Sequence, residues 1–177
     1  IDFHVRDCMG RSWQCGTIQV DFSMPERFGA TYEAEDGTRK CPVMLHRAIL
    51  GSLERFIGIL IEHYAGKFPL FLAPEQARVL PVSDKFNDYA SQVNDTLRAA
   101  GLRSTVDLRP EKLGKKIRDA QLAHVNYQLV IGGREETDHT VSIRTRGNEN
   151  LGALPVSDLV ARMKTEVDGR VLNPSAQ

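Results

Sequence analysis

The spacing of apolar positions changes near residue 50, and that change predicts a strand followed by a helix. Residues 43–50 are mostly apolar, which is typical of a buried strand, and Gly51-Ser52 interrupts the run. Beyond this break the apolar residues recur at steps of three and four, which predicts an amphipathic helix that ends with Gly66 at its C′ position. Its inner face would carry Leu53, Phe56, Ile57, Leu60, Ile61 and Tyr64.

Upstream of this stretch the pattern favours antiparallel strands. Residues 17–22 alternate strictly, with Ile18, Val20 and Phe22 on one side, which predicts a half-buried strand. Its polar side carries Thr17, Gln19 and Asp21, and this side could line a cleft or simply face solvent. Asp36-Gly37 marks a turn, so a hairpin should lead into the strand at 43–50.

Two prolines, Pro69 and Pro74, lie in a stretch that is typical of a linker, and we place a domain boundary near Leu70. Beyond it, strands and helices alternate. This order predicts an α/β fold with three layers, in which a mixed, mostly parallel sheet lies between helices. The expected strands are 78–82, 104–108, 127–131 and, added at an edge, 140–145; the expected helices are 83–100 and 157–167, capped by Ser83-Asp84 and Ser157, and 113–123. The tail at 173–177 should fray.

Composition excludes several classes of protein. Lys and Arg number 23, as do Asp and Glu, so any nucleic-acid contact must depend on local clusters of charge. The three cysteines show no regular spacing, which argues against a disulfide framework and suits a reducing cytoplasm. We find neither a signal peptide nor a long apolar run, and therefore expect no membrane partner. The chain does not begin with Met, which suggests a fragment.

The residues around Arg55 carry a resemblance to a known family. Leu50-Gly51-Ser52-Leu53-Glu54-Arg55 resembles the third signature motif of class II aminoacyl-tRNA synthetases. The runs SWQCGTIQVDF at 12–22 and MLHRA at 44–48, together with Phe68-Pro69 and the residues at 72–74, resemble the C-terminal part of threonyl-tRNA synthetases. The resemblance covers essentially the whole chain. It implies that residues 1–69 end a class II catalytic domain and that residues 70–177 form an anticodon-binding domain.

The resemblance implies an ATP-dependent ligase that activates threonine and transfers it to tRNA-Thr. It places Arg55, as the catalytic residue, beside the base and phosphates of ATP, with Gln14 and Ser52 near the adenosine and Gln19 near the threonine. ATP would bind with Mg²⁺, and the full-length enzyme would be a homodimer. A guanidinium is planar and always charged, which suits it to stacking on a base and to phosphate. Spacing alone favours a solvated start of a helix for Glu54-Arg55.

His46 would be one of three protein ligands of a zinc ion in this family, and the other two, a Cys and a His, would lie upstream of residue 1. Three protein ligands leave a fourth position of tetrahedral zinc open, which the threonine could occupy. Spacing alone favours a structural histidine, since His46 is a lone histidine in a strand.

In the second domain, segments 108–118, 133–135 and 141–146 resemble the anticodon-binding part of the family. Single-stranded bases are recognised through their exposed edges and by stacking, including on arginine. The resemblance implies contacts to the tRNA anticodon from Lys112, Arg118, Arg134, Glu135 and Arg144. Lys115 and Lys116 are better explained as a solvated start of a helix, and Pro110 departs from the family pattern.

Two alternatives remain open. The chain could be a stand-alone, non-catalytic module that binds tRNA or another RNA stem-loop. It could also be the same part of a prolyl- or histidyl-type synthetase, although His46 and the run Gln14-Cys15-Gly16-Thr17 favour the threonyl type.

Overall fold

The chain divides into two compact units, Ile1–Gly66 and Lys67–Gln177. The computed structural model describes residues 1–172, so the tail at 173–177, which we expect to fray, lies outside the described residues. Within the described part of the chain, every helix is too short or too polar to cross a membrane.

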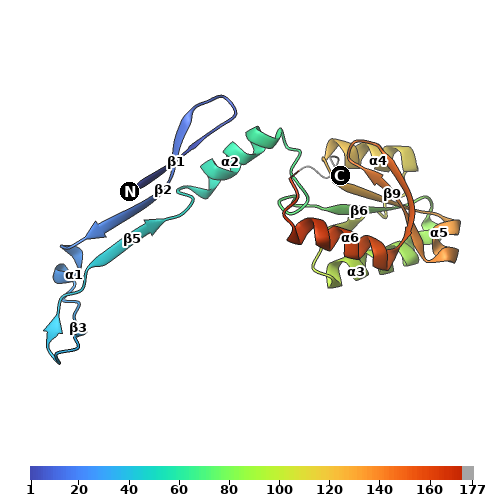
Figure 1. The fold of residues 1–177 in the computed structure, drawn as a ribbon. Helices are drawn as coiled ribbons and strands as arrows, with labels where there is room; N and C mark the ends of the chain where they lie inside the picture. The colour runs from blue at the N-terminus through green and yellow to red at the C-terminus, as the bar shows by residue number, and fades with distance from the viewer. Residues whose placement is uncertain (173–177) are drawn as a thin grey trace. The chain divides into compact units, whose positions relative to one another are not determined.

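The first unit is built on antiparallel strands (Figure 1). Its sheet has the order β1-β2-β5, and a separate hairpin pairs β3 with β4 around the predicted turn at Asp36-Gly37. The alternating segment, the hairpin and the helix after Gly51 are thus confirmed. The elements are β1 (Asp2–Arg6), β2 (Ser12–Asp21), α1 (Met24–Arg27), β3 (Tyr32–Glu33), β4 (Arg39–Lys40), β5 (Met44–Ala48) and α2 (Leu53–Tyr64).

The strand expected at 43–50 forms, but it is not buried. Leu45 in β5 is 66% exposed and Val20 in β2 is 55% exposed, so the expectation of a buried or half-buried strand is wrong for these residues. The reason is physical: an apolar run shows that a face can be buried, while burial itself requires something to pack on that face. Within the described residues, these side chains stay accessible.

Helix α2 begins and ends through specific backbone contacts. The Ser52 hydroxyl accepts a hydrogen bond from the backbone N–H of Arg55 at 3.4 Å, as expected at an N-cap. At the other end, Ala65 N–H donates to Glu62 O at 3.2 Å and Gly66 N–H to Ile61 O at 3.0 Å. This is a Schellman motif, in which the residue at C′ is left-handed. That residue is Ala65, with φ of 49°, so Gly66 follows the C′ position and does not occupy it.

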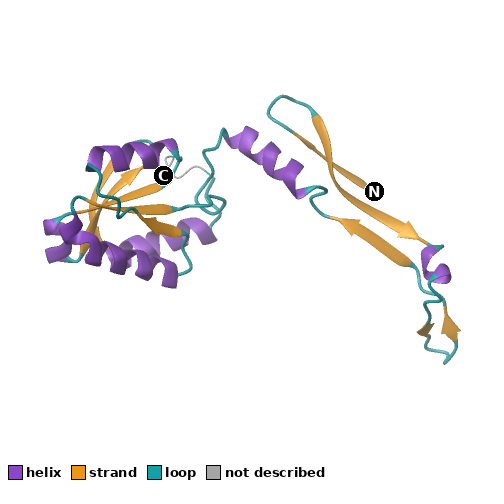
Figure 2. Ribbon diagram, turned by 180° about the vertical axis from the view of Figure 1, so that it is seen from behind, coloured by secondary structure: helices purple, strands orange, loops and turns teal. Residues whose placement is uncertain are grey.

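The second unit is a three-layer α/β fold, as predicted (Figure 2). Its sheet has the order β10-β9-β8-β6-β7, with β6 parallel to β7 and β8, and β9 antiparallel to both β8 and β10. Four of the five strands therefore point the same way. Helices α3 and α6 lie on one face and α4 on the other (Figure 1). The elements are β6 (Ala77–Pro81), η1 (Asp84–Phe86), α3 (Asn87–Ala99), β7 (Ser104–Val106), α4 (Leu113–Leu122), β8 (Tyr127–Ile131), α5 (Gly133–Asp138), β9 (Thr140–Thr145), β10 (Asn150–Pro155) and α6 (Val156–Asp168).

Two elements of this unit were missing from the sequence prediction. The short helix α5 follows β8 directly, and β10 pairs outside β9, so β9 is not the edge strand. Strand β10 escapes a pattern search because Gly152, with φ of 81°, and a register shift after Asn150 interrupt it. The caps also differ: η1 precedes α3, Pro155 is the N-cap of α6, and the Ser83 and Ser157 side chains cap neither helix.

Lys116 contradicts the interpretation of the start of α4 as a solvated surface. Lys116 is only 2% exposed, and its Nζ donates a hydrogen bond to the carbonyl oxygen of Pro81 at 3.2 Å. Lys115 is exposed, as expected, and pairs with Glu111 at 2.5 Å. Successive residues of a helix point about 100° apart, so adjacent lysines need not share a surface. Lys116 therefore contributes a buried, hydrogen-bonded ammonium beneath the helix.

We expect Tyr127→Phe to destabilise the second unit by about 1–3 kcal/mol. The Tyr127 hydroxyl donates to Glu166 Oε2 at 2.7 Å, and both residues are buried. Removing the hydroxyl would leave that carboxylate oxygen buried without this donor. The measurement is the free energy of unfolding in urea, with Tyr32→Phe as the matched control because Tyr32 is 50% exposed. Equal unfolding midpoints for the two variants would contradict the structural role of the hydrogen bond.

Candidate functional site: a polar sheet face and the start of helix α2

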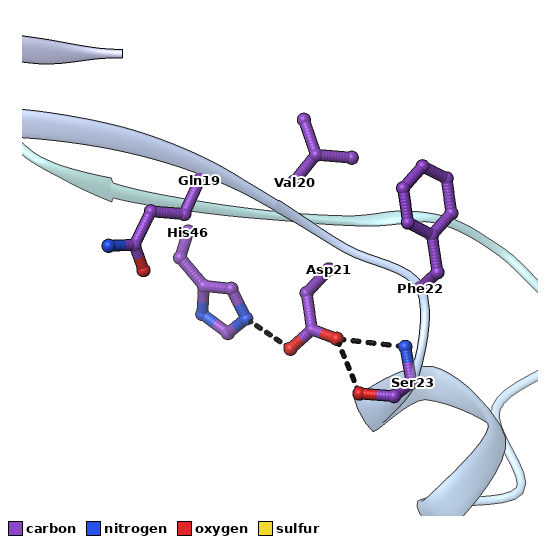
Figure 3. A pocket seen from close by; sticks show the side chains of 6 residues that line it. All are labelled: Gln19, Val20, Asp21, Phe22, Ser23 and His46. Carbon is purple, nitrogen blue, oxygen red and sulfur yellow. Dashed lines mark hydrogen bonds and ion pairs between the residues drawn. The ribbon is translucent and has the colours of Figure 1, made fainter.

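A pocket of about 510 Å³ opens on the polar side of β2 and β5 (Figure 3). Gln19 lies opposite His46 in the register of these strands, so both side chains lie on the same face of the sheet. Asp21 is on that face too, two residues after Gln19 in the strand. The pocket is lined by Gln19, Val20, Asp21, Phe22, Ser23 and His46.

Gln14 reaches the same face because β2 is irregular. Thr17 pairs with Asp2 while Gln14 pairs with His4, so β2 holds one extra residue relative to β1. Such a bulge reverses the alternation of side chains on its two sides. The Gln14 side chain accordingly donates to Asp2 Oδ1 at 2.8 Å, on the side that also carries Gln19 and His46. Sequence alternation alone would have placed Gln14 on the opposite face.

His46 has a carboxylate partner that the sequence analysis did not assign. Its Nε2 lies 2.9 Å from Asp21 Oδ2 (Figure 3). The other Asp21 oxygen accepts from Met24 N–H at 3.0 Å, and from Ser23 N–H at 2.9 Å and Ser23 Oγ at 3.1 Å. The Met24 hydrogen bond, followed by those from His46 and Ser23, lowers the pKa of Asp21 well below its usual range. Asp21 therefore remains an anion that fixes the orientation of the imidazole.

The residues at this site fit one ligand position of a zinc ion and no more. A metal-bound histidine usually has a carboxylate or carbonyl on its other ring nitrogen, and Asp21 gives His46 that partner. A protein zinc site needs three or four donors, however, and the described residues include no group of three His, Cys, Asp or Glu that could hold a metal. Cys8 and Cys41 are exposed and Cys15 is buried. The residues that the structure describes thus supply His46 as one candidate ligand and do not complete a zinc site by themselves.

Ser52 and Arg55 lie at the start of α2, where the chain leaves β5. Besides capping the helix, the Ser52 hydroxyl donates to Glu54 Oε2 at 2.7 Å. This hydrogen bond lowers the pKa of Glu54. The Arg55 guanidinium is exposed, and its Cζ lies 5.8 Å from the centroid of the Trp13 ring. Arg55 thus sits on the surface beside β2 with its charge available to a ligand.

In the second unit, Glu135 links α5 to β9. Its Oε2 accepts from the Gly132 N–H at 2.9 Å, which caps α5, and its Oε1 accepts from the Ser142 hydroxyl at 2.6 Å. Burial tends to raise the pKa of Glu135, but the Ser142 and backbone hydrogen bonds outweigh it and lower the pKa. Arg144 follows Ser142 by two residues in β9 and points to the same face of the sheet. The structure thus brings Glu135 and Arg144 onto one side of β9.

The other three residues predicted to contact the anticodon are exposed. Arg134 precedes Glu135 in α5, whereas Lys112 and Arg118 lie at α4, with Lys112 at its N-cap position. Among the residues that the structure describes, neither Lys112 nor Arg118 forms a side-chain hydrogen bond or ion pair with the α5 and β9 residues. The predicted set therefore comes from three separate elements of the unit: α4, α5 and β9.

Each of the two units matches a protein-family model. The model described as "Anticodon binding domain" matches residues 76–166, slightly more than half of the chain. The model described as "tRNA synthetase class II core domain (G, H, P, S and T)" matches residues 1–64. These matches define the class of protein as a class II aminoacyl-tRNA synthetase, represented here by part of the core domain and by the anticodon-binding domain.

Sequence relatives narrow the class II synthetases to the threonyl type. The chain is 58% identical over 170 residues to threonine–tRNA ligase of Dechloromonas aromatica, covering 96% of this chain and 27% of that protein. It is 55% identical over 170 residues to that of Finegoldia magna, with the same coverage of both proteins. The chain belongs to the threonyl-tRNA synthetase family, and it spans about a quarter of the length of the curated relatives it matches.

Solved structures agree with this assignment. The RNA-binding domain of threonyl-tRNA synthetase from Cryptosporidium parvum is 38% identical, with a TM-score of 0.79 over 93% of this chain and 42% of that one. Prolyl-tRNA synthetase from the same organism is 22% identical, with a TM-score of 0.64 over 90% of this chain and 34% of that one. The second similarity shows a shared fold alone.

Proposed function

We propose that this chain is part of a threonine–tRNA ligase, which activates threonine with ATP and transfers it to tRNA-Thr. In this proposal residues 1–69 belong to the catalytic domain and residues 70–177 recognise the tRNA anticodon. The observation that carries the proposal is the match of the two units to the class II core and anticodon-binding models, together with relatives that are threonine–tRNA ligases. We use "full-length ligase" for this chain joined to the upstream part that the family resemblance implies.

In the first unit, the polar sheet face and the start of α2 would bind parts of the adenylate. Gln14 and Ser52 would contact the adenosine and Gln19 the threonine. Arg55 would act as the catalytic residue, since its exposed guanidinium can stack on a base and pair with phosphate. Adenylate formation and acyl transfer pass through charged states that positioned donors stabilise. ATP with Mg²⁺ is the expected nucleotide substrate.

Membership of the threonyl-tRNA synthetase family also implies a zinc ion and a second subunit. His46 would supply one zinc ligand in the full-length ligase, with the other two in the upstream part. A bound metal would supply a position that recognises the amino and hydroxyl groups of threonine. A site that contacts the substrate hydroxyl directly rejects an analogue without that hydroxyl far better than an apolar pocket can. We propose that the full-length ligase is a cytoplasmic homodimer.

In the second unit, the anticodon would bind across α4, α5 and β9. Arg118, Arg134 and Arg144 would hold bases and phosphates, with Lys112 adding positive charge at the start of α4. Glu135 already accepts two hydrogen bonds, but a carboxylate has about four acceptor positions, so it can also accept from a base edge. The overall charge is zero, hence binding would depend on this local set and not on a uniform basic surface.

The purified chain of 177 residues should bind a threonine anticodon stem-loop but should not form threonyl-adenylate. It carries one zinc ligand and about a quarter of the length of its relatives. The measurement is threonine-dependent pyrophosphate–ATP exchange, with Arg55→Ala as the matched control. Exchange by the wild-type chain above that control would contradict the proposal that adenylate formation requires the upstream part of the full-length ligase. Exchange by the full-length ligase, absent when threonine is omitted, would support the proposed reaction.

A further inference from the structure

The indole ring of Trp13 has two guanidinium groups beside it. The Cζ of Arg55 lies 5.8 Å from the ring centroid and the Cζ of Arg11 lies 5.5 Å from it. Both distances are within the roughly 6 Å over which a cation is attracted to an aromatic face. Trp13 is only partly exposed, and it is the one tryptophan in the chain. The resemblance and the proposed function assign it no role.

A buried carboxylate holds the indole in place. Trp13 Nε1 donates to Asp7 Oδ2 at 2.8 Å, and the Asp7 side chain is fully inaccessible to solvent. The other Asp7 oxygen accepts from the backbone N–H groups of Met9 and Arg11, each at 2.9 Å. Burial opposes ionisation of Asp7, but the hydrogen bonds from Trp13 and Arg11 outweigh it and lower its pKa to about 2. The Asp7 carboxylate, which accepts from the indole N–H, therefore remains charged at neutral pH.

Arg11 ties this cluster to the helix that carries Arg55. Its Nε donates to Asp7 Oδ2 at 2.5 Å and its Nη2 to Glu62 Oε2 in α2, also at 2.5 Å. Two carboxylates thus balance the charge of Arg11, which reduces its repulsion of the Arg55 guanidinium near the same ring. The Arg55 guanidinium itself makes no hydrogen bond or ion pair with any other residue of the described chain. Its contact with the Trp13 ring is therefore expected to restrict the conformations of its side chain.

We propose that Trp13, held by Asp7 and Arg11, is a positioning residue for Arg55 in ATP binding. This inference rests on the proposed function of Arg55. A long, exposed arginine loses side-chain entropy when it is fixed against a ligand. A ring that already restricts the guanidinium reduces that loss, because fewer conformations remain to be excluded on binding. The effect should appear in the affinity for ATP and not in the affinity for threonine.

The test compares Trp13→Leu, Trp13→Met, Trp13→Phe and Arg55→Ala in the full-length ligase, by pyrophosphate–ATP exchange. Leu and Met remove the aromatic face, whereas Phe keeps a smaller aromatic face and loses the pyrrole ring with its N–H donor to Asp7. We expect Leu and Met each to raise the KM for ATP about fivefold with the KM for threonine unchanged, and Phe to stay within about twofold of wild type. Melting temperatures identify a variant that fails to fold, and the remaining aliphatic variant then decides.

A double-mutant cycle separates positioning from a general structural role. If Trp13 acts through Arg55, adding Trp13→Leu to Arg55→Ala should change the KM for ATP by less than about twofold. A further fivefold rise in that double variant, or an equal rise in the KM values for ATP and threonine, would overturn the inference alone. An unchanged KM for ATP in Arg55→Ala would instead contradict the proposed role of Arg55, and the inference with it.

Discussion

Replacing His46 with Ala in the full-length ligase is expected to remove most of the bound zinc and to lower threonine activation by more than about a hundredfold. Changes in the outer shell of a metal site alone cost about 10–100-fold, and a direct ligand should cost more. His46 lines the pocket on the polar sheet face, beside Gln19, with Asp21 2.9 Å from its Nε2. Zinc content by elemental analysis and exchange activity are the two measurements.

Two control variants make this result specific. His63→Ala removes an exposed histidine on α2 and should leave both zinc content and activation at wild-type levels. Binding of the anticodon stem-loop should be unchanged in both variants, because the second unit carries the proposed RNA contacts. Stoichiometric zinc in His46→Ala, together with normal activation, would refute the assignment of His46 as a ligand.

The second large effect concerns recognition of bases. Arg144→Ala should weaken binding of the threonine anticodon stem-loop by about 1–3 kcal/mol if Arg144 contacts a base edge. Glu135→Gln should reduce discrimination more than affinity, because a neutral amide still accepts one hydrogen bond but loses the charge-assisted one. Gln can also keep the cap of α5 that Glu135 now provides through the Gly132 N–H, so the fold should survive the substitution.

Lys115→Ala is the matched control for these variants. Lys115 is exposed and paired with Glu111, so its loss should cost little, and equally for every stem-loop. Each variant is titrated with matched and single-base-swapped stem-loops at one salt concentration, since salt alone changes such affinities strongly. If Arg144→Ala and Glu135→Gln both keep the wild-type ratio of matched to swapped binding, neither residue reads a base.

Local periodicity was sufficient to predict most elements of both units. Helix α2 and strands β8 and β9 follow directly from their apolar spacing, and the alternation of strands and helices gave the three-layer fold. Periodicity failed where a strand is interrupted, as at Gly152 in β10, and where a helix is as short as α5, which is separated from the end of β8 by one residue. It also failed for burial of β5, because a pattern along one strand does not reveal what covers it.

At the candidate site, the sequence predicted the residues but not the contacts that surround them. Residue types and a resemblance singled out Gln14, Gln19, His46 and Arg55, but their surroundings depend on contacts between distant segments. Asp21 and His46 are 25 residues apart and meet only through the pairing of β2 with β5. Gln14 reaches their face only because of a bulge, and Trp13 meets Arg55 only through the fold of the first unit. A strand register or a bulge could have revealed these partners, and neither is visible in one sequence.

Under the proposed function, the second unit recognises the anticodon of tRNA-Thr. The most direct test of this recognition is a titration of the wild-type chain of 177 residues with a threonine anticodon stem-loop and with the same loop carrying single-base swaps in the anticodon. We expect each swap at a recognised base to weaken binding by about tenfold or more at fixed salt, because base-edge contacts are lost. Equal affinity for matched and swapped loops would contradict the proposed recognition.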